Sequence, residues 1–347
     1  MFSPMAETDA ASKDTSGAAA RIHAIEAAVG TTVLGQEGVI REAIACLLAG
    51  GHGLLEGQPG VAKTLLVKSI AAATGIRFSR IQFTPDLLPA DITGTEVIVD
   101  GPEGRRFEFR QGPLFGHIVL ADEVNRATPR TQSALIEAMA EQTVSSGNER
   151  HELPSPFTVL ATQNPVEMEG TFPLPEAQLD RFLLKIHVPA PGEDALVKVF
   201  ERTNQADAPL PERVVSMDEL RALIDEVRTV EIPEPLLRQV ARVIRATDPA
   251  GSNGTDAARR NLRLGSSPRG GEAICRVARV AALRDGRHYA TPADLAWALT
   301  PALRHRLLPS FEAEARGLTD DALVADVLHD LPELPSEVQH VLEAIDR

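Results

Sequence analysis

The stretch Gly57-Gln58-Pro59-Gly60-Val61-Ala62-Lys63-Thr64 decides the fold of this chain. It follows a short apolar run at 52–56, typical of a buried strand, and it leads into a helical pattern over 65–73. A glycine-rich turn between strand and helix forms a phosphate-binding loop, because its backbone N–H groups and the helix N-terminus attract an anion. Lys63 would reach the outer phosphates and the Thr64 hydroxyl would hold Mg²⁺. The stretch and the adjoining Leu65 therefore predict a nucleotide site.

One position departs from the usual pattern, in which a glycine precedes the lysine. Here Ala62 stands at that position. Alanine adds a single methyl group and is compatible with a helical backbone at the start of the next helix, so we expect the loop to be retained. A plain glycine-rich turn is the alternative, and the strand before and the helix after it argue against that alternative.

The size and charge of the chain limit its function. Its 347 residues suit two domains better than one. It carries 35 basic and 49 acidic side chains, a formal net charge of −14. Because phosphate repels a net acidic protein, and no dense Lys/Arg run is present, we expect only poor non-specific binding to nucleic acid. A local basic groove is still compatible with this charge.

The N-terminus and the cysteines carry no targeting or redox signal. Residues 1–19 are rich in Ala, Ser, Thr and Asp and lack an apolar signal core, which predicts a disordered lead. No apolar stretch approaches the ~20 residues that span a bilayer. Cys46 and Cys275 are isolated in apolar helical patterns, which predicts buried thiols. We expect a cytoplasmic protein without membrane insertion.

Strand and helix signals alternate between residues 20 and 190, which predicts a three-layer α/β domain around a parallel sheet. Apolar runs suited to buried strands lie at 53–56, 77–83, 117–121, 157–162 and 182–188. Helical patterns lie at 40–49, 64–73, 129–141 and 175–181. Two interruptions, 91–111 and 142–153, carry short strand signals around a glycine-containing turn and predict β-hairpins.

A linker signal, Pro189-Ala190-Pro191-Gly192, ends this alternation. The residues from 191 to 310 predict an all-α lid domain without strands. Its Gly/Asn/Asp/Arg-rich stretch 247–264 predicts a mobile loop. Residues 311–347 predict an acidic tail in which one or two helices pack on the lid. The expected lid helices are 193–205, 216–228, 235–246, 268–284 and 292–306.

Two acids follow the apolar run at 117–121. Asp122 and Glu123 are therefore expected at the carboxyl edge of the sheet, where open α/β folds bind ligands. Asp122 would support the Mg²⁺ shell, and Glu123 would orient and polarise the attacking water. Taken alone, the pair could simply be solvated acids at a strand end. Its position downstream of a phosphate-binding loop favours the catalytic interpretation.

Three further polar residues are candidates, and local sequence leaves each with an alternative. Asn164 ends the next strand and could contact the γ-phosphate or hold the water, or it could initiate a turn before proline. Arg181 could enter a neighbouring subunit's phosphate site as an arginine finger, or it could cap a helix C-terminus. Arg269 opposes the dipole at the start of a lid helix, which predicts that it clamps an anion there unless it only faces solvent.

Taken together, these elements resemble an AAA+ ATPase, and more narrowly the MoxR family. The resemblance extends from about residue 32 to about residue 305. It is carried by 57–64, 120–127 (LADEVNRA), 129–137 (PRTQSALIE), 161–165, 169–171, 174–182 (LPEAQLDRF), Ser267-Pro268-Arg269 and Arg304-His305-Arg306.

This resemblance implies residue roles at the nucleotide. Lys63 and Thr64 match the Walker A pair, Asp122 and Glu123 match the Walker B pair, and Asn164 matches sensor 1.

It also implies roles for more distant residues. Arg181 matches the arginine finger and Arg269 matches sensor 2. Val33 and Gly35 match the stretch that flanks adenine. Alanine is usual in this family at the position of Ala62.

The resemblance further implies an assembly and a task. The two hairpins match the helix-2 insert and the pre-sensor-1 insert. Members of the family form rings, usually hexamers, with ATP between subunits. They are thought to remodel protein clients, often with a von Willebrand factor A domain partner, in metal-cofactor insertion and enzyme maturation.

Three alternative functions share part of this pattern. A magnesium-chelatase-like motor subunit shares both inserts, although the string 169–176 suits the MoxR family better. A DNA-acting AAA+ motor would need basic hairpin tips, which Arg105 and Arg106 support weakly and the net charge disfavours. A nucleotide-gated scaffold without turnover would not need Glu123.

Overall fold

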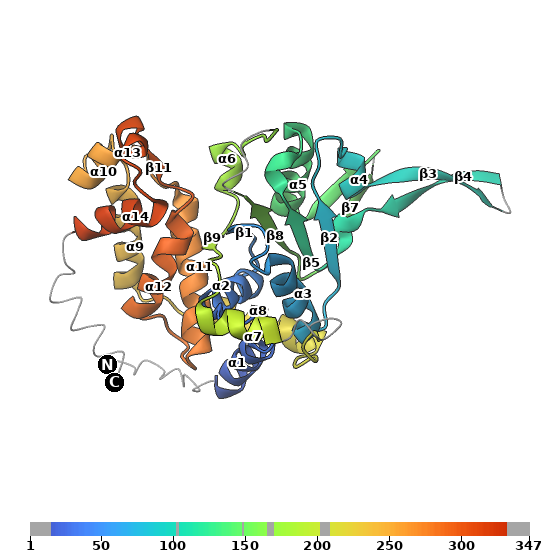
Figure 1. The fold of residues 1–347 in the computed structure, drawn as a ribbon, viewed down its shortest axis with the longest axis horizontal. Helices are drawn as coiled ribbons and strands as arrows, with labels where there is room; N and C mark the ends of the chain where they lie inside the picture. Colours follow the sequence, from blue (N-terminus) through green and yellow to red (C-terminus); the bar gives the residue numbers. More distant parts are fainter. Residues whose placement is uncertain (1–14, 102–103, 148, 165–169, 202–208, 332–347) are drawn as a thin grey trace, which may run out of the picture.

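The computed structural model describes residues 15–101, 104–147, 149–164, 170–201 and 209–331. Its centre is a five-stranded sheet in the order β2-β5-β8-β1-β9, and every neighbouring pair is parallel (Figure 1). The strands are β1 (Gly53–Glu56), β2 (Phe78–Gln82), β5 (Ile118–Asp122), β8 (Thr158–Gln163) and β9 (Leu184–His187). The predicted fold class is confirmed.

Helices cover both faces of this sheet. Alternate side chains of one strand enter two different cores: Ile118 and Leu120 join one, and Val119 and Ala121 join the other. The first core is covered by α1 (Ser16–Gly30), α2 (Glu37–Leu48) and α3 (Lys63–Thr74). The second is covered by α4 (Pro89–Thr93) and α5 (Pro129–Glu141). Burial on both faces explains the continuous apolar runs in the sequence.

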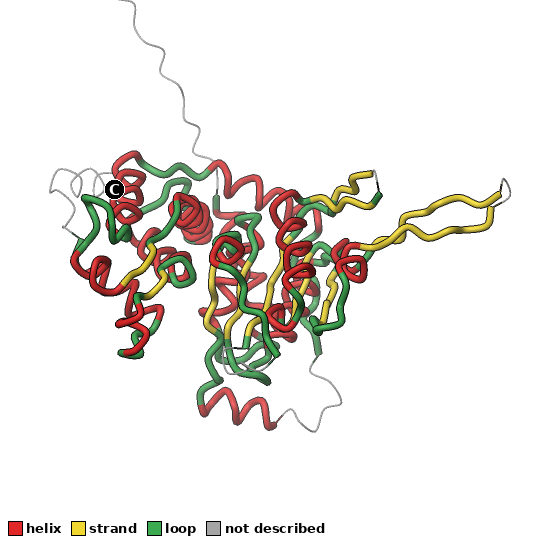
Figure 2. Tube along the Cα trace, turned by 90° about the horizontal axis from the view of Figure 1, so that it is seen from above, coloured by secondary structure: helices red, strands yellow, loops and turns green. Residues whose placement is uncertain are grey.

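Two hairpins leave the α/β layer, as predicted. One is β3 (Gly94–Gly101) with β4 (Gly104–Gln111), the long arm in Figures 1 and 2. The other is β6 (Thr143–Ser146) with β7 (Glu149–Glu152). Phe109 of β4 stacks on His151 of β7 with ring centroids 3.8 Å apart, so the hairpins contact each other. The residues 102–103 and 148 lie outside the described residues.

The helical lid contains a short helix and a pair of short strands that the sequence does not predict. Its long helices are α7 (Glu193–Glu201), α8 (Met217–Thr229), α9 (Glu234–Ala246), α11 (Pro268–Arg284) and α12 (Pro292–Leu303). The mobile loop predicted at 247–264 is wrong over residues 256–264, which form α10 (Asp256–Asn261) and β10 (Leu262–Leu264). The Thr255 hydroxyl accepts a hydrogen bond from the Ala258 N–H and caps α10. Strand β10 pairs with β11 (Leu308–Pro309), so the lid is not free of strands.

Both ends of the described chain pack on the rest. Helix α1 begins at Ser16, so the predicted disordered lead extends too far, and residues 1–14 lie outside the described residues. The short helices α13 (Phe311–Ala315) and α14 (Asp320–His329) pack on α10, and α14 also packs on α12. Their buried side chains join the same core as the lid helices.

Short elements complete the fold: the 3₁₀ turns Pro113–Phe115 and Val124–Arg126 and the helix α6 (Glu176–Leu179). Among the helices that the structure describes, none combines the length and the apolar character needed to cross a membrane.

Helix α1 supplies a test of the fold. Ile22 is 0% exposed within the first core, so Ile22→Ala should lower the free energy of unfolding by about 2–5 kcal/mol. The matched control is Arg21→Ala, whose side chain is 42% exposed and whose removal should change stability by about 0.5 kcal/mol or less. Urea unfolding measures both. Equal stability of the two variants would contradict the placement of α1 in the core.

Candidate active site

The carboxyl ends of β1, β5 and β8 meet at one edge of the sheet, and most of the predicted site lies there. A cavity of about 380 Å³ opens at this edge. This volume falls within the range of small-molecule sites. Its lining includes most of the predicted nucleotide residues: Pro59, Gly60, Ala62, Lys63, Thr64, Leu65, Asp122, Glu123 and Asn164, together with Thr162.

The loop after β1 has the open backbone expected of a phosphate cradle. Gly60 has a φ of 84°, and Ala62 has a φ of 62° with a ψ of 19°. Ala62 precedes α3 in the left-handed region, where a Cβ costs roughly 1–2 kcal/mol. The loop is retained, with local strain at the position that more often holds glycine.

Contacts within the loop fix its shape. The Lys63 Nζ donates to the Gly57 carbonyl oxygen at 2.6 Å. A Cβ at Gly57 would lie 2.5 Å from the Val188 carbonyl oxygen, so only glycine fits beside β9. The Gln36 side-chain amide donates to the Val61 carbonyl at 3.3 Å and the Pro189 carbonyl at 3.2 Å. Gln36 therefore ties the loop to the linker that leads to the lid.

Asp122 is held from two sides. The Thr162 hydroxyl on β8 donates to Asp122 Oδ1 at 2.7 Å. The Arg80 guanidinium on β2 donates to Asp122 Oδ2 at 2.7 and 3.2 Å. The Asp122 side chain is 13% exposed and lines the cavity. Its hydrogen bonds hold the carboxylate in a fixed position there.

Glu123 has its own set of partners. Its backbone lies in the left-handed region, with φ of 57°, and its N–H donates to Thr162 Oγ1 at 2.8 Å. The Gln82 amide and the Arg126 guanidinium each donate to Glu123 Oε2 at 2.9 Å. Because both donors use one oxygen, they fix the direction in which the carboxylate points.

Sequence reasoning missed Arg80, Gln82, Arg126 and Thr162. Arg80 and Gln82 lie two residues apart on one face of β2, and the Arg80 guanidinium also donates to Gln82 Oε1 at 2.7 Å. The only signal in the sequence is two polar residues spaced by two in a short strand. Their link to Asp122 and Glu123 depends on β2 lying beside β5 in the sheet.

The stretch expected to flank adenine lies close to the loop but outside the lining of this cavity. Val33 is 2% exposed and belongs to the first core. Gly35 has a φ of 69°, and a Cβ there would lie 2.7 Å from the Ala195 Cβ of α7. Asn164, 6% exposed, lines the cavity at the end of β8, and the residues 165–169 that follow it lie outside the described residues.

The two predicted arginines lie at the opposite edge of the sheet. Arg181 precedes β9, and together with Arg269 it lines a second cavity of about 270 Å³. The residues 50–52, which precede β1, line the same cavity. A strand of four residues is about 13 Å long, more than an arginine side chain can reach. Neither arginine can therefore contact the loop of its own chain in this arrangement.

An ionic cluster lies directly before the phosphate-binding loop. Lys185 of β9 pairs with Glu56 of β1 at 2.8 Å and with Asp320 of α14 at 2.5 Å. Burial raises the pKa of Glu56, but the hydrogen bonds and charges of His187 and Lys185 outweigh it and hold the pKa at about 2. Glu56 therefore stays ionised near neutral pH and links the strand before the loop to the C-terminal helices.

The donor set of the first cavity fits a magnesium triphosphate. Lys63 and the N-terminus of α3 supply positive potential for phosphate oxygens. The Thr64 hydroxyl and the Asp122 carboxylate are the hard oxygen ligands that Mg²⁺ prefers. An oxygen-rich wall facing a cationic loop suits such a ligand better than an apolar cofactor.

The chain is similar to known proteins over most of its length. Residues 52–184 match the model of the ATPase family associated with various cellular activities (AAA), and residues 255–327 match the AAA lid domain. Chaperone MoxR1 of Mycobacterium tuberculosis is 40% identical over 90% of this chain and 83% of the relative. Protein MoxR of Paracoccus denitrificans is 34% identical over 86% of this chain and 92% of the relative. A crystal structure from Cytophaga hutchinsonii has a TM-score of 0.84 at 36% identity and covers 92% of this chain and 96% of its own.

The backbone of Ala62 predicts an unusual response to substitution. Ala62→Gly should raise the free energy of unfolding by about 1 kcal/mol, because it removes the Cβ from a left-handed residue. Ala72→Gly within α3 is the matched control and should lower it by about 1 kcal/mol. Denaturant unfolding compares the two. A loss of stability in both variants would show that Ala62 is unstrained.

Proposed function

The chain belongs to the MoxR family of AAA+ ATPases, and we propose that it hydrolyses Mg²⁺-bound ATP between the subunits of a ring to remodel a protein client. The observation that carries this proposal is the separation of the two cavities. The loop and the acids lie at one edge of the sheet, and Arg181 and Arg269 lie at the other. One chain therefore holds two halves of a site that it cannot close by itself.

A head-to-tail assembly closes the site. If the carboxyl edge of one subunit faces the amino edge of the next, Arg181 and Arg269 approach the neighbour's phosphates. Such heterologous contacts form a ring when the rotation between copies closes, and a hexamer is the usual family outcome. Arg181 is exposed and Arg269 is 48% exposed, which suits side chains that would contact a neighbouring subunit.

Within one subunit, each residue at the carboxyl edge has a defined task. Lys63 and the loop backbone hold phosphate oxygens, Thr64 and Asp122 would hold Mg²⁺, and Asn164 would orient the γ-phosphate. The ion, when bound, neutralises charge that develops on the phosphates. Glu123 would orient the attacking water.

Hydrolysis would act on a client through the lid and the two hairpins. Loss of the γ-phosphate removes contacts made by two subunits at once, which favours movement of one against the other. The β3–β4 hairpin presents a cross-strand apolar pair, Ile98 at 61% and Phe107 at 71% exposure. A pair of this kind suits an apolar or unfolded segment of a protein client.

The partner and the biological task rest on the family resemblance. A von Willebrand factor A domain partner and a role in metal-cofactor insertion or complex maturation are therefore part of this proposal. The hairpin arginines give no support to a DNA-acting motor. Arg105 pairs with Asp100 at 3.2 Å and Arg106 pairs with Glu108 at 3.3 Å, so acids in the same hairpin neutralise both.

A shared site makes turnover depend on assembly. ATPase turnover per subunit should fall when the protein is diluted, and chelation of Mg²⁺ should abolish it. Arg181→Ala should lower kcat by about 10³-fold or more, while the affinity for a fluorescent ATP analogue stays within about twofold. Arg238→Ala on α9, 71% exposed, is the control and should retain parental turnover.

A different result would overturn this account. Turnover that is independent of dilution and unchanged in Arg181→Ala would describe a self-sufficient monomer. Loss of nucleotide affinity in Arg181→Ala would place the arginine at its own subunit's site.

A further inference from the structure

Asp180 lies directly before Arg181, and side chains from the lid converge on its carboxylate. We propose that Asp180 is a positioning residue that fixes the Arg181 segment to the lid, so that lid and finger move as one unit. This inference rests on the proposed function, in which Arg181 serves a neighbouring subunit.

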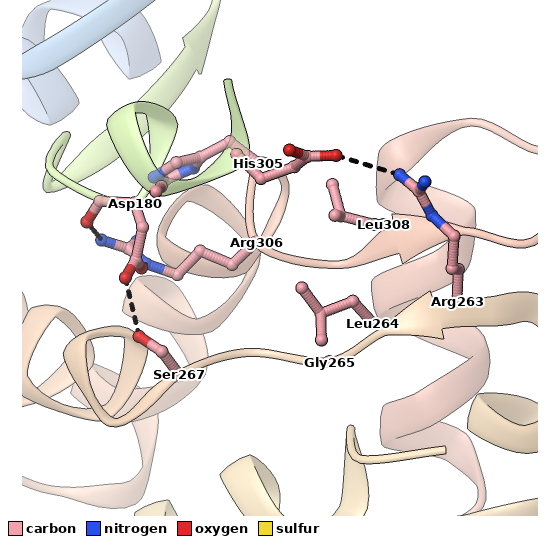
Figure 3. A pocket seen from close by; sticks show the side chains of 10 residues that line it. Asp180, Arg263, Leu264, Gly265, Ser267, His305, Arg306 and Leu308 are labelled. Carbon is pink, nitrogen blue, oxygen red and sulfur yellow. Dashed lines mark hydrogen bonds and ion pairs between the residues drawn. The ribbon is translucent and has the colours of Figure 1, made fainter. Parts of the chain in front are cut away.

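The contacts of Asp180 come from two separate segments of the lid. Arg306, after α12, donates from Nε to Asp180 Oδ1 at 2.8 Å. The Ser267 hydroxyl, at the N-cap of α11, donates to Asp180 Oδ2 at 2.8 Å. Arg269 Nη1 lies 3.5 Å from the same oxygen. Figure 3 shows Arg306 and Ser267 reaching Asp180 from different lid segments.

Arg306 also donates hydrogen bonds to the backbone around Arg181. Its guanidinium donates to the carbonyl oxygens of Asp180 at 3.1 Å, Phe182 at 2.6 Å and Leu183 at 3.2 Å. Arg306 is 6% exposed. A buried charge of this kind is tolerated only when its partners stay in place. Arg181 lies between the bonded carbonyls of Asp180 and Phe182, so Arg306 restrains the backbone on both sides of it.

Helix α6, which precedes Asp180, faces the lid across a cavity. Helix α6 has no buried residue, and a cavity of about 530 Å³ lies between it and the lid segment that carries β10 and β11 (Figure 3). Across the cavity, Arg263 pairs with Glu176 at 3.0 Å, and both side chains are more than half exposed. An exposed pair contributes little to stability. The lid therefore holds this region through Asp180 and the backbone that follows it rather than through packing of α6.

The consequence concerns communication between subunits. A lid that moves with its own subunit's nucleotide would carry the Asp180 segment with it. The finger that it moves belongs to the neighbour's site. Asp180 would thus relay the state of one nucleotide site to the next without contacting either nucleotide.

Asp180→Asn tests the proposal, because asparagine keeps the shape and one acceptor oxygen but removes the charge. We expect kcat to fall by about 10²-fold through misplacement of the finger. The affinity for a fluorescent ATP analogue and the ring should be retained, since the loop lies at the other edge. Arg263→Gln, which removes only the exposed pair across the cavity, is the matched control and should keep parental turnover.

Mixed rings distinguish positioning from general damage. Glu123→Gln inactivates a subunit's own site but leaves its finger intact, whereas Asp180→Asn does the reverse. Mixing the two variants should therefore restore turnover that neither has alone. Mixing Arg181→Ala with Glu123→Gln is the reference for a defect in the finger itself.

The outcomes separate the two proposals. Recovery in the reference mixture but not with Asp180→Asn overturns the role of Asp180 and leaves the shared site standing. Recovery in neither mixture overturns the shared site. If Asp180→Asn fails to assemble, Ser267→Ala removes one hydrogen bond to the same carboxylate and should lower kcat about fivefold with recovery on mixing. Unchanged kcat in Ser267→Ala would then overturn the role of Asp180.

Discussion

The parallel alignment of five strands is the constraint on which the rest of the structure depends. Because every strand runs in the same direction, the segments that follow strands gather at one edge and the segments that precede strands gather at the other. The phosphate-binding loop, Asp122 and Asn164 follow strands. Arg181 precedes one. The separation of the loop from Arg181 is thus a property of the topology, and no change of side-chain rotamer removes it. A site that needs both must be built from two chains.

This constraint also explains how much of the site could be predicted from the sequence. The acids after the run at 117–121 are predicted to lie beside the phosphate-binding loop because parallel strands share a carboxyl edge. This prediction needs no measured distance between the residues. The same logic could not find Arg80 and Gln82. Their position depends on β2 lying beside β5, and that order is decided by how the helices pack on the two faces of the sheet rather than by a local pattern.

The fold shows a similar division between local and tertiary signals. Apolar patterns in the sequence predict the strands of the sheet, the two hairpins and most lid helices. Glycine and polar residues dominate the segment 247–264 and predict a loop, yet a capped helix and pairing with β11 order its residues 256–264. At Ala62 the local sequence gives no sign of the left-handed backbone that the loop imposes. Tertiary context overrode local preference at both places.

The kind of interaction at Asp180 matters as much as its position. An apolar contact between α6 and the lid would tolerate sliding, because burial of apolar surface has no direction. Hydrogen bonds from a buried guanidinium are directional. They are therefore lost together when the backbone carbonyls of Asp180, Phe182 and Leu183 shift relative to Arg306. The adjoining cavity leaves α6 little apolar contact that could replace them. In our proposal, a lid joined in this way transmits displacement to the Arg181 segment instead of absorbing it.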